Sequence, residues 1–370
     1  MNQPTEGSQI QGQRADVVFG ADGYAALYAT EGCVSGLYYH SSRGAALHLD
    51  MLSCGLRGLN VLDVGCGCGA TLLALANHVP ASITCVDSSS GMVAFLQMLF
   101  LSDQNIEESL RAGGVAELLP PDLFGPAVEY FNRQRRRFLA STFMKSGGQV
   151  IVKMMSSLDI TKEKFGLFDA IVGNNFIHWP INSRRVELKK AHPDWSDGQV
   201  LNTAIDDALR PLVSVLRPGG AMVLMEPKNF VVCDDDPVQE KQCADAMTST
   251  HPLYKKFQET LNRMISERYG VQRVAPKSPG MFDLSRIHQI LHRNGLAPQG
   301  VLHEESVTCC DVLYSQLLRS PMVLGAVDIS LYEKMALGRE AVEELRRTAS
   351  VAELGQPLYS QNFFICATSI

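Results

Sequence analysis

Short apolar runs alternate with longer helix-compatible segments from about residue 58 to residue 232. Each run has the length of one buried strand and stops at a glycine or a polar residue. The five strands predicted in this way are Asn60–Val64, Ser82–Asp87, Gln149–Val152, Phe168–Gly173 and Ala221–Glu226. Strands that alternate with helices predict a parallel sheet that is covered by helices on both faces.

Two further runs, Val301–Val307 and Asn362–Thr368, complete the predicted sheet. No helical segment follows the last run, and the two runs together suit an antiparallel pair at the edge of the sheet. The predicted fold class is therefore α/β, with a seven-stranded, mostly parallel sheet that ends in an antiparallel C-terminal edge strand.

Three long stretches interrupt the alternation at 102–146, 233–282 and 310–357. Their sequences are compatible with helices and too apolar for disorder, and long insertions that are ordered are usually functional. We expect them to pack as a helical cap over one end of the sheet. The predicted division is an N-terminal helical lid segment (1–57), a cofactor-binding core (58–232) that contains the first insertion, the second insertion as part of the cap, and the C-terminal part of the sheet (283–370) with the third insertion.

The composition is that of an ordinary globular protein, with 46% hydrophobic and 19% charged residues. A net charge of −6 gives no general attraction to nucleic acid or to an anionic membrane surface. No apolar run reaches the roughly 20 residues that span a membrane, and no secretory signal is recognisable, so we expect a cytoplasmic protein. The ten cysteines include no CxxC pair, and no metal site is predicted.

A glycine-rich turn follows the first predicted strand, with Gly65, Gly67 and Gly69 in a G-x-G-x-G spacing. Glycine at these positions lets backbone N–H groups approach a ligand that a Cβ atom would block. The spacing alone is weak evidence, because dinucleotide-binding proteins carry the similar G-x-G-x-x-G. An acidic residue, Asp63, precedes the turn by two positions.

Four ordered segments resemble the class I S-adenosylmethionine-dependent methyltransferases. These are Asp63–Gly69, Asp87–Met92, Phe168–Val172 and Arg217–Leu224. They match the family's D-x-G-x-G-x-G turn, its D-x-S-x-x-M segment, its fourth strand and the P-G-G turn before its fifth strand. The resemblance covers about residues 58–101 and 147–228, outside the insertions. It implies a Rossmann-like sheet, methyl transfer, and S-adenosylmethionine as the cofactor.

The resemblance also implies which residues hold the cofactor. Asp63 and the turn residues Gly65, Cys66, Gly67 and Gly69 would hold its methionine end. Asp87 would accept hydrogen bonds from the ribose, with Ser88 and Met92 beside the adenine. Asp159 is the candidate for the adenine amine, and a helix-cap or surface role is the alternative. Asn174 and Asn175 follow the fourth strand and would border the methyl-transfer site.

Electrostatics favour the same cofactor independently of the resemblance. The negative pyrophosphate of NAD would be repelled by a carboxylate at Asp63. The ammonium and sulfonium groups of S-adenosylmethionine are cationic and suit that position. We therefore expect this chain to bind S-adenosylmethionine and not NAD.

The segment Asn174–Pro180 borders the expected acceptor site. It lacks the prolines of adenine-N6 and glutamine methyltransferases, and its x-x-H-W form resembles small-molecule methyltransferases of the ubiquinone/menaquinone and trans-aconitate types. His178 is the candidate general base, since a histidine can accept a proton near neutral pH; a structural hydrogen bond is the alternative. Trp179 is a candidate substrate contact, although core packing suits it better than a cation–π contact.

Two further groups could contact the acceptor. Arg135 is the representative of the basic run Arg133–Arg137 and could bind an acidic molecule, with a solvated helix face as the alternative. Tyr38 and Tyr39 could form a lid over the cofactor or pack in a helical core.

The predicted function is S-adenosylmethionine-dependent methyl transfer to an O, N, C or S atom of a small molecule, with an acidic molecule as one option. The alternatives are methylation of RNA or protein, and a non-catalytic regulator that binds S-adenosylmethionine. Neither a nucleic acid nor a membrane is expected as a partner, and the sequence is compatible with a monomer or an oligomer.

Overall fold

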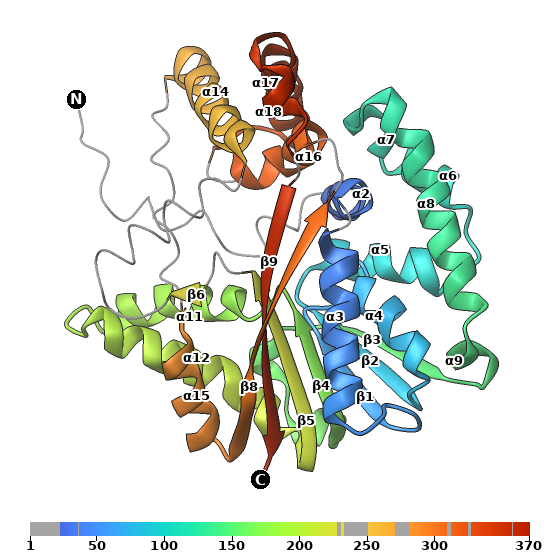
Figure 1. The fold of residues 1–370 in the computed structure, drawn as a ribbon, viewed down its shortest axis with the longest axis vertical. Helices are drawn as coiled ribbons and strands as arrows, with labels where there is room; N and C mark the ends of the chain where they lie inside the picture. Colours follow the sequence, from blue (N-terminus) through green and yellow to red (C-terminus); the bar gives the residue numbers. More distant parts are fainter. Residues whose placement is uncertain are drawn as a thin grey trace.

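The computed structural model describes residues 23–35, 37–227, 231–232, 251–270, 282–308, 312–324, 327–356 and 358–370. A central sheet lies between two layers of helices, and further helices stand above one end of the sheet (Figure 1). Most of the second predicted insertion lies outside the described residues, and so do Cys309 and Cys310.

The sheet has seven strands in the order β3-β2-β1-β4-β5-β9-β8. Their bounds are β1 Asn60–Val64, β2 Ser82–Asp87, β3 Gln149–Met154, β4 Phe168–Asn174, β5 Leu216–Pro227, β8 Leu296–Thr308 and β9 Leu358–Ser369. Strands β1 to β5 are parallel, and β9 is antiparallel to both of its neighbours. A separate two-stranded sheet joins β6 (Val231–Val232) to β7 (Phe282–Asp283).

The predicted fold class is confirmed, with one difference in detail. The C-terminal strand β9 is antiparallel, as expected, but it lies one place inside the edge of the sheet, because β8 pairs along its outer side from Leu296 to Thr308. The edges are β3 and β8. Strand β5 also begins earlier than predicted, because the segment Arg217–Gly220, expected to close the preceding helix, is part of the strand.

Side chains that alternate along the strands build two apolar cores, one on each face. Val61 and Val172 belong to the core beneath α3 (Leu37–Leu52), α4 (Ala70–Leu75) and α5 (Ser90–Phe100). Leu62 and Ile171 belong to the core beneath α11, α12 and α15. These last helices span His178–Ala191, Asp197–Ser214 and Leu284–Arg293. Both faces of the central strands are therefore covered by helices, and most of their polar side chains lie near the strand ends.

The insertions provide the helices above the sheet, and α2 (Tyr24–Ser35) stands between two groups of them (Figure 1). One group is α6 (Ile106–Ala112), α7 (Val115–Leu118), α8 (Pro121–Leu139) and α9 (Thr142–Lys145). The other is α14 (Pro252–Tyr269), α16 (Val312–Val323), α17 (Leu331–Thr348) and α18 (Val351–Leu354). Helix α2 contacts α7, α8 and α16. The expected helical cap is present in the described residues.

Polar contacts connect the two groups of the cap. Arg339 on α17 donates to the carbonyl oxygens of Glu117 and Leu118, both at 2.8 Å. Arg319 on α16 lies 3.0 Å from the buried Glu31 carboxylate of α2. These contacts hold helices from the N-terminus, the first insertion and the third insertion together. None of the described helices is long and apolar enough to cross a membrane.

Candidate active site

The three glycines of the loop after β1 have different physical roles. Gly65 and Gly69 have φ angles of 66° and 86°, and a Cβ atom would lie 2.3 Å from the Phe176 ring or 2.7 Å from the Phe100 ring, respectively. Gly67 also has a positive φ, 49°, but no atom lies within 4 Å of the position its Cβ would take. The first and third glycines therefore permit close packing. The middle one presents backbone to open space, where a ligand can approach.

Asp87, at the end of β2, holds this loop in place. One oxygen of its carboxylate accepts a hydrogen bond from the Gly67 N–H at 2.9 Å, and the other accepts from the Ser89 N–H at 2.9 Å. Burial raises the pKa of Asp87, against the lowering effect of these bonds. A carboxylate has about four lone-pair positions, so Asp87 can still accept hydrogen bonds from a ligand. Ser88 is exposed beside it.

Asp63 is fully buried, and neither of its carboxylate oxygens has a partner in the described part of the chain. Burial, and secondarily the charge of Asp87, raise the pKa of Asp63 to about 8. The protein without cofactor therefore holds this group mostly neutral at pH 7. The expected attraction of cations by Asp63 depends on its ionisation, which a nearby cation would itself favour.

The thiols around the loop serve in packing. Cys68 Sγ lies 3.3 Å from Met92 Sδ and 3.3 Å from the carbonyl oxygen of Ala25 on α2. Burial raises the pKa of Cys68, so its thiol is unreactive at neutral pH. Met92 is itself buried. Cys68 thus connects the glycine loop to α5 through Met92 and to α2 through Ala25.

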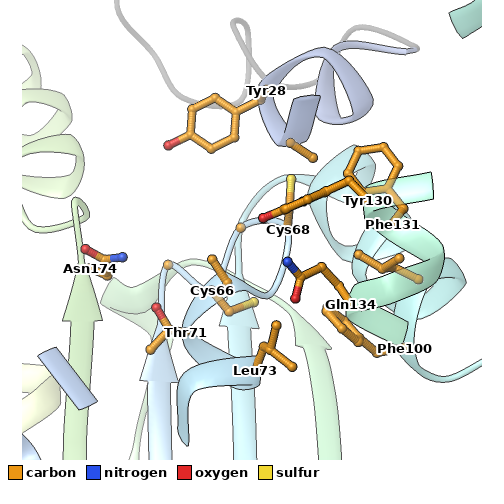
Figure 2. A pocket seen from close by; sticks show the side chains of 15 residues that line it. Tyr28, Cys66, Cys68, Thr71, Leu73, Phe100, Tyr130, Phe131, Gln134 and Asn174 are labelled. Carbon is orange, nitrogen blue, oxygen red and sulfur yellow. The ribbon is translucent and has the colours of Figure 1, made fainter. Parts of the chain in front are cut away.

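The loop opens into a pocket between α2, α8 and the end of β4 (Figure 2). None of the lining residues is charged. They are Tyr28, Ala29, Gly65, Cys66, Gly67, Cys68, Ala70, Thr71, Leu73, Leu99, Phe100, Tyr130, Phe131, Gln134 and Asn174.

The structure brings part of the predicted cofactor set to this pocket. Gly65, Cys66, Gly67 and Asn174 line it. The other predicted residues lie nearby without lining it, apart from Asp159, which is exposed at the end of a short 3-10 helix, Ser157–Asp159. The surface alternative for Asp159 fits this position better than an adenine contact does.

The segment after β4 is held by an acid that the sequence analysis did not name as a site residue. Glu226 ends the apolar part of β5 and is fully buried. Its Oε1 accepts hydrogen bonds from the N–H groups of Phe176 at 3.0 Å and Ile177 at 2.7 Å. Its Oε2 lies 2.7 Å from Nδ1 of His178. A buried acid after five apolar residues at a strand's carboxyl end is a signal that could have identified it.

His178 and Trp179 begin α11 beside this acid. His178 is 4% exposed, and when Nδ1 donates to Glu226, the basic lone pair belongs to Nε2. The His178 and Trp179 ring centroids are 5.1 Å apart, and Trp179 packs partly buried against the core. Neither residue lines the pocket. The position of Trp179 agrees with its packing interpretation.

The prediction for Arg135 is wrong. Its guanidinium donates to the carbonyl oxygens of Leu99 at 2.8 Å and Gln104 at 2.6 Å, and also to that of Met98. These bonds cap the end of α5 and turn the guanidinium toward backbone carbonyls, and Arg135 does not line the pocket. The preceding residue, Gln134, faces the pocket instead. Tyr38 and Tyr39 lie in the first turn of α3, but their side chains are outside the described part of the structure.

Comparison with known proteins finds a family match in the segment that carries the glycine loop. Residues 61–124 match a family model described as a methyltransferase domain. No curated protein sequence matches this chain.

Among solved structures, the YcgJ protein of Bacillus subtilis is 16% identical, with a TM-score of 0.40 and coverage of 89% of this chain and 98% of that one. A putative sarcosine dimethylglycine methyltransferase of Galdieria sulphuraria is 14% identical, with a TM-score of 0.39 and coverage of 88% and 85%. Magnesium protoporphyrin IX methyltransferase of Synechocystis PCC 6803, with bound S-adenosylhomocysteine, is 12% identical, with a TM-score of 0.36 and coverage of 90% and 84%. Similarities this low do not indicate a shared substrate.

Strands β1 to β5 are parallel and adjacent in the order that places the glycine loop at the carboxyl edge of the sheet. The open backbone at Gly67 and the strand-end Asp87 suit the cofactor site of an S-adenosylmethionine-dependent methyltransferase. Together with the match of residues 61–124, they show that the chain contains a methyltransferase domain.

Proposed function

We propose that this enzyme methylates a small, uncharged molecule that enters the site at the carboxyl end of β1 and β4. The observation that carries the proposal is the pocket on the glycine loop, which α2 and α8 cover and which no charged side chain lines. An acceptor that binds there, beside the cofactor, meets aromatic side chains such as Tyr28, Tyr130 and Phe131.

The residues present fit S-adenosylmethionine. Gly67 offers backbone with no atom within 4 Å of its Cβ position, and Asp87 keeps acceptor capacity beside it. Asp63 and Asn174 add buried oxygens that lack partners in the described residues. When bound, the cofactor supplies a methyl group activated by the sulfonium. The chain's own contribution is to orient both molecules and exclude water, and orientation alone can supply roughly 7–11 kcal/mol of rate acceleration.

The covered pocket supports a small acceptor over RNA or protein. Helix α2 lies directly on the loop, since Cys68 Sγ is 3.3 Å from the Ala25 carbonyl oxygen. A polymer would have to displace this helix to reach the pocket. An acidic acceptor is not favoured either, because the guanidinium of Arg135 is bound to backbone carbonyls.

His178 is the proposed proton acceptor, and Glu226 the residue that positions it. Both lie at the carboxyl edge of the sheet that holds the pocket, and Glu226 fixes the imidazole through Nδ1. The alternative is that the histidine only stabilises the turn after β4.

The proposal is tested with S-adenosylmethionine that carries a labelled methyl group and a cell lysate divided by size filtration. We expect label in the small-molecule fraction and release of S-adenosylhomocysteine. Label confined to a nuclease-sensitive or protein fraction would instead support RNA or protein methylation. Cofactor binding without turnover in any fraction would support a regulator. Gly67→Ala, whose added methyl occupies the ligand space, is the matched inactive control.

A further inference from the structure

Gln134 is a buried polar residue with an unmet hydrogen bond. Its side chain is 5% exposed and lines the pocket, yet its Oε1 has no partner in the described part of the chain. Buried amide oxygens in native proteins are nearly always paired, so an unpaired one in a pocket wall is a candidate contact for a bound molecule. Figure 2 shows the side chain reaching from α8 toward the loop that carries Cys66.

A second unpaired oxygen lies on the opposite wall of the pocket. Asn174, at the end of β4, donates through Nδ2 to Ser42 Oγ at 2.6 Å, while its Oδ1 has no described partner. In Figure 2 the two amides flank the glycine loop from opposite sides. The walls of the pocket thus hold unpaired amide oxygens at Gln134 and Asn174 and no charged side chain. Their polar complement is a group with N–H or O–H donors.

We infer that Gln134 Oε1 accepts a hydrogen bond from the α-ammonium group of bound S-adenosylmethionine. This inference rests on the cofactor assignment within the proposed function. It extends the cofactor site from the core into the first insertion, because α8 lies almost entirely beyond the segment matched by the methyltransferase family model.

The assignment to the ammonium follows from where the cofactor's other donors go. The ribose hydroxyls are expected at Asp87, which does not line this pocket. The methionine end is expected against Gly65–Cys68, which do line the pocket together with Gln134. An ammonium has three N–H donors and no acceptor, so it suits the unpaired oxygen of Gln134.

Gln134 is held in place by its neighbours on α8. Arg135 anchors the helix to the end of α5 through backbone carbonyls. The Phe131 and Phe138 rings, on the same buried stripe as Gln134, pack edge-on against Phe95 and Phe100 at centroid distances of 5.3 and 5.1 Å. A rigid helix presents the acceptor without an ordering cost at the moment of binding.

The test is calorimetric titration of the wild-type chain and of Gln134→Leu with two ligands. One is S-adenosylhomocysteine, and the other is its analogue with hydrogen in place of the α-amino group. We expect Gln134→Leu to weaken binding of S-adenosylhomocysteine about 5- to 30-fold and to leave binding of the analogue unchanged. Arg137→Leu, on the exposed side of the same helix, should change neither constant.

Gln134→Glu tests whether the effect of Gln134→Leu comes from the missing acceptor oxygen or from the altered packing of the side chain. It keeps the acceptor atoms and adds a negative charge, so it should bind S-adenosylhomocysteine at least as tightly as the wild type. Equal weakening of both ligands by Gln134→Leu, or unchanged binding of S-adenosylhomocysteine, would overturn the ammonium contact alone. Failure of the wild-type chain to bind S-adenosylhomocysteine would overturn the proposed function as well.

Discussion

Oε2 of Glu226 lies 2.7 Å from Nδ1 of His178, and both side chains are buried. The same carboxylate accepts two backbone N–H groups from the turn after β4. That turn also carries Phe176, whose ring contacts the position where Gly65 would have a side chain. One acid on β5 therefore fixes both the candidate base and the packing beneath the glycine loop.

The roles of His178 and Glu226 can be separated by kinetics. We expect His178→Gln to lower methyl transfer by about 10²–10⁴, the usual contribution of a general base, with little change in affinity for S-adenosylhomocysteine. Glu226→Gln should lower the rate less, because the imidazole loses the carboxylate that orients it but keeps a side chain of the same shape. The measurement is kcat and KM with the identified acceptor. A His178→Gln enzyme with wild-type rate would leave the histidine a purely structural role.

Asp87→Ala should weaken binding of S-adenosylhomocysteine by about 1–3 kcal/mol, since the Gly67 N–H and the expected ribose hydroxyls lose their acceptor. Asp159→Ala should leave affinity unchanged, because Asp159 is exposed and outside the pocket. Calorimetry on both variants, after circular dichroism confirms folding, measures the difference. Unchanged affinity in Asp87→Ala would remove that residue from the site.

Alanine at Gly65 and at Gly67 should give opposite phenotypes. Both positions have positive φ, which costs a residue with a Cβ about 1–2 kcal/mol. At Gly65 the new methyl also collides with the Phe176 ring, so stability should fall further. At Gly67 it projects into open space, so the protein should fold but lose cofactor affinity. Urea unfolding measures the stability of both variants, and calorimetry measures their affinity for S-adenosylhomocysteine. A Gly67→Ala protein with full affinity would place the cofactor elsewhere.

Asp63 should make stability depend on pH. Its pKa in the folded protein is about 8, above the ordinary value of 3.8, so the neutral carboxyl is the form that suits the fold. Its contribution is fully present below the ordinary pKa and is lost as pH rises through about 8. We expect the free energy of unfolding of the wild type to fall across this range relative to Asp63→Asn. Parallel pH curves for the two proteins would contradict the raised pKa.

The same group should release a proton when cofactor binds at pH 7. A cation placed near Asp63 favours the ionised carboxylate, which is the minor form in the cofactor-free protein. Calorimetry of S-adenosylmethionine binding in buffers of different ionisation enthalpy would detect the proton. Asp63→Asn serves as the control, because the amide has no proton to release in this range.

Arg135→Leu should affect stability and not substrate recognition. The variant leaves the carbonyls of Leu99 and Gln104 without their donor, and we expect a loss of about 1.5–3 kcal/mol in the free energy of unfolding. Arg137→Leu, at an exposed position two residues later, should stay within about 0.5 kcal/mol of the wild type. An Arg135→Leu protein of normal stability but raised KM for the acceptor would show that Arg135 contacts the substrate after all.

Features that depend on local sequence pattern could be predicted from the sequence alone. The bounds of β1 and β2 agree with the apolar runs, because a strand buried on both faces is mostly apolar. The glycine loop and Asp87 could also be predicted from the sequence. A tight turn whose backbone approaches a ligand needs glycines at fixed positions, and Asp87 lies at the end of the next strand, where it binds the Gly67 N–H. These features are separated by few residues and obey local geometry.

Which distant side chains come into contact could be seen only in the tertiary structure. Gln134 and Arg135 are consecutive, and helical periodicity points them in directions about 100° apart; packing of α8 on α5 turned the glutamine to the pocket and the arginine to backbone carbonyls. Glu226 and His178 are separated by 48 positions and meet because β4 and β5 are adjacent. Such contacts depend on how distant segments pack together, which no local pattern encodes.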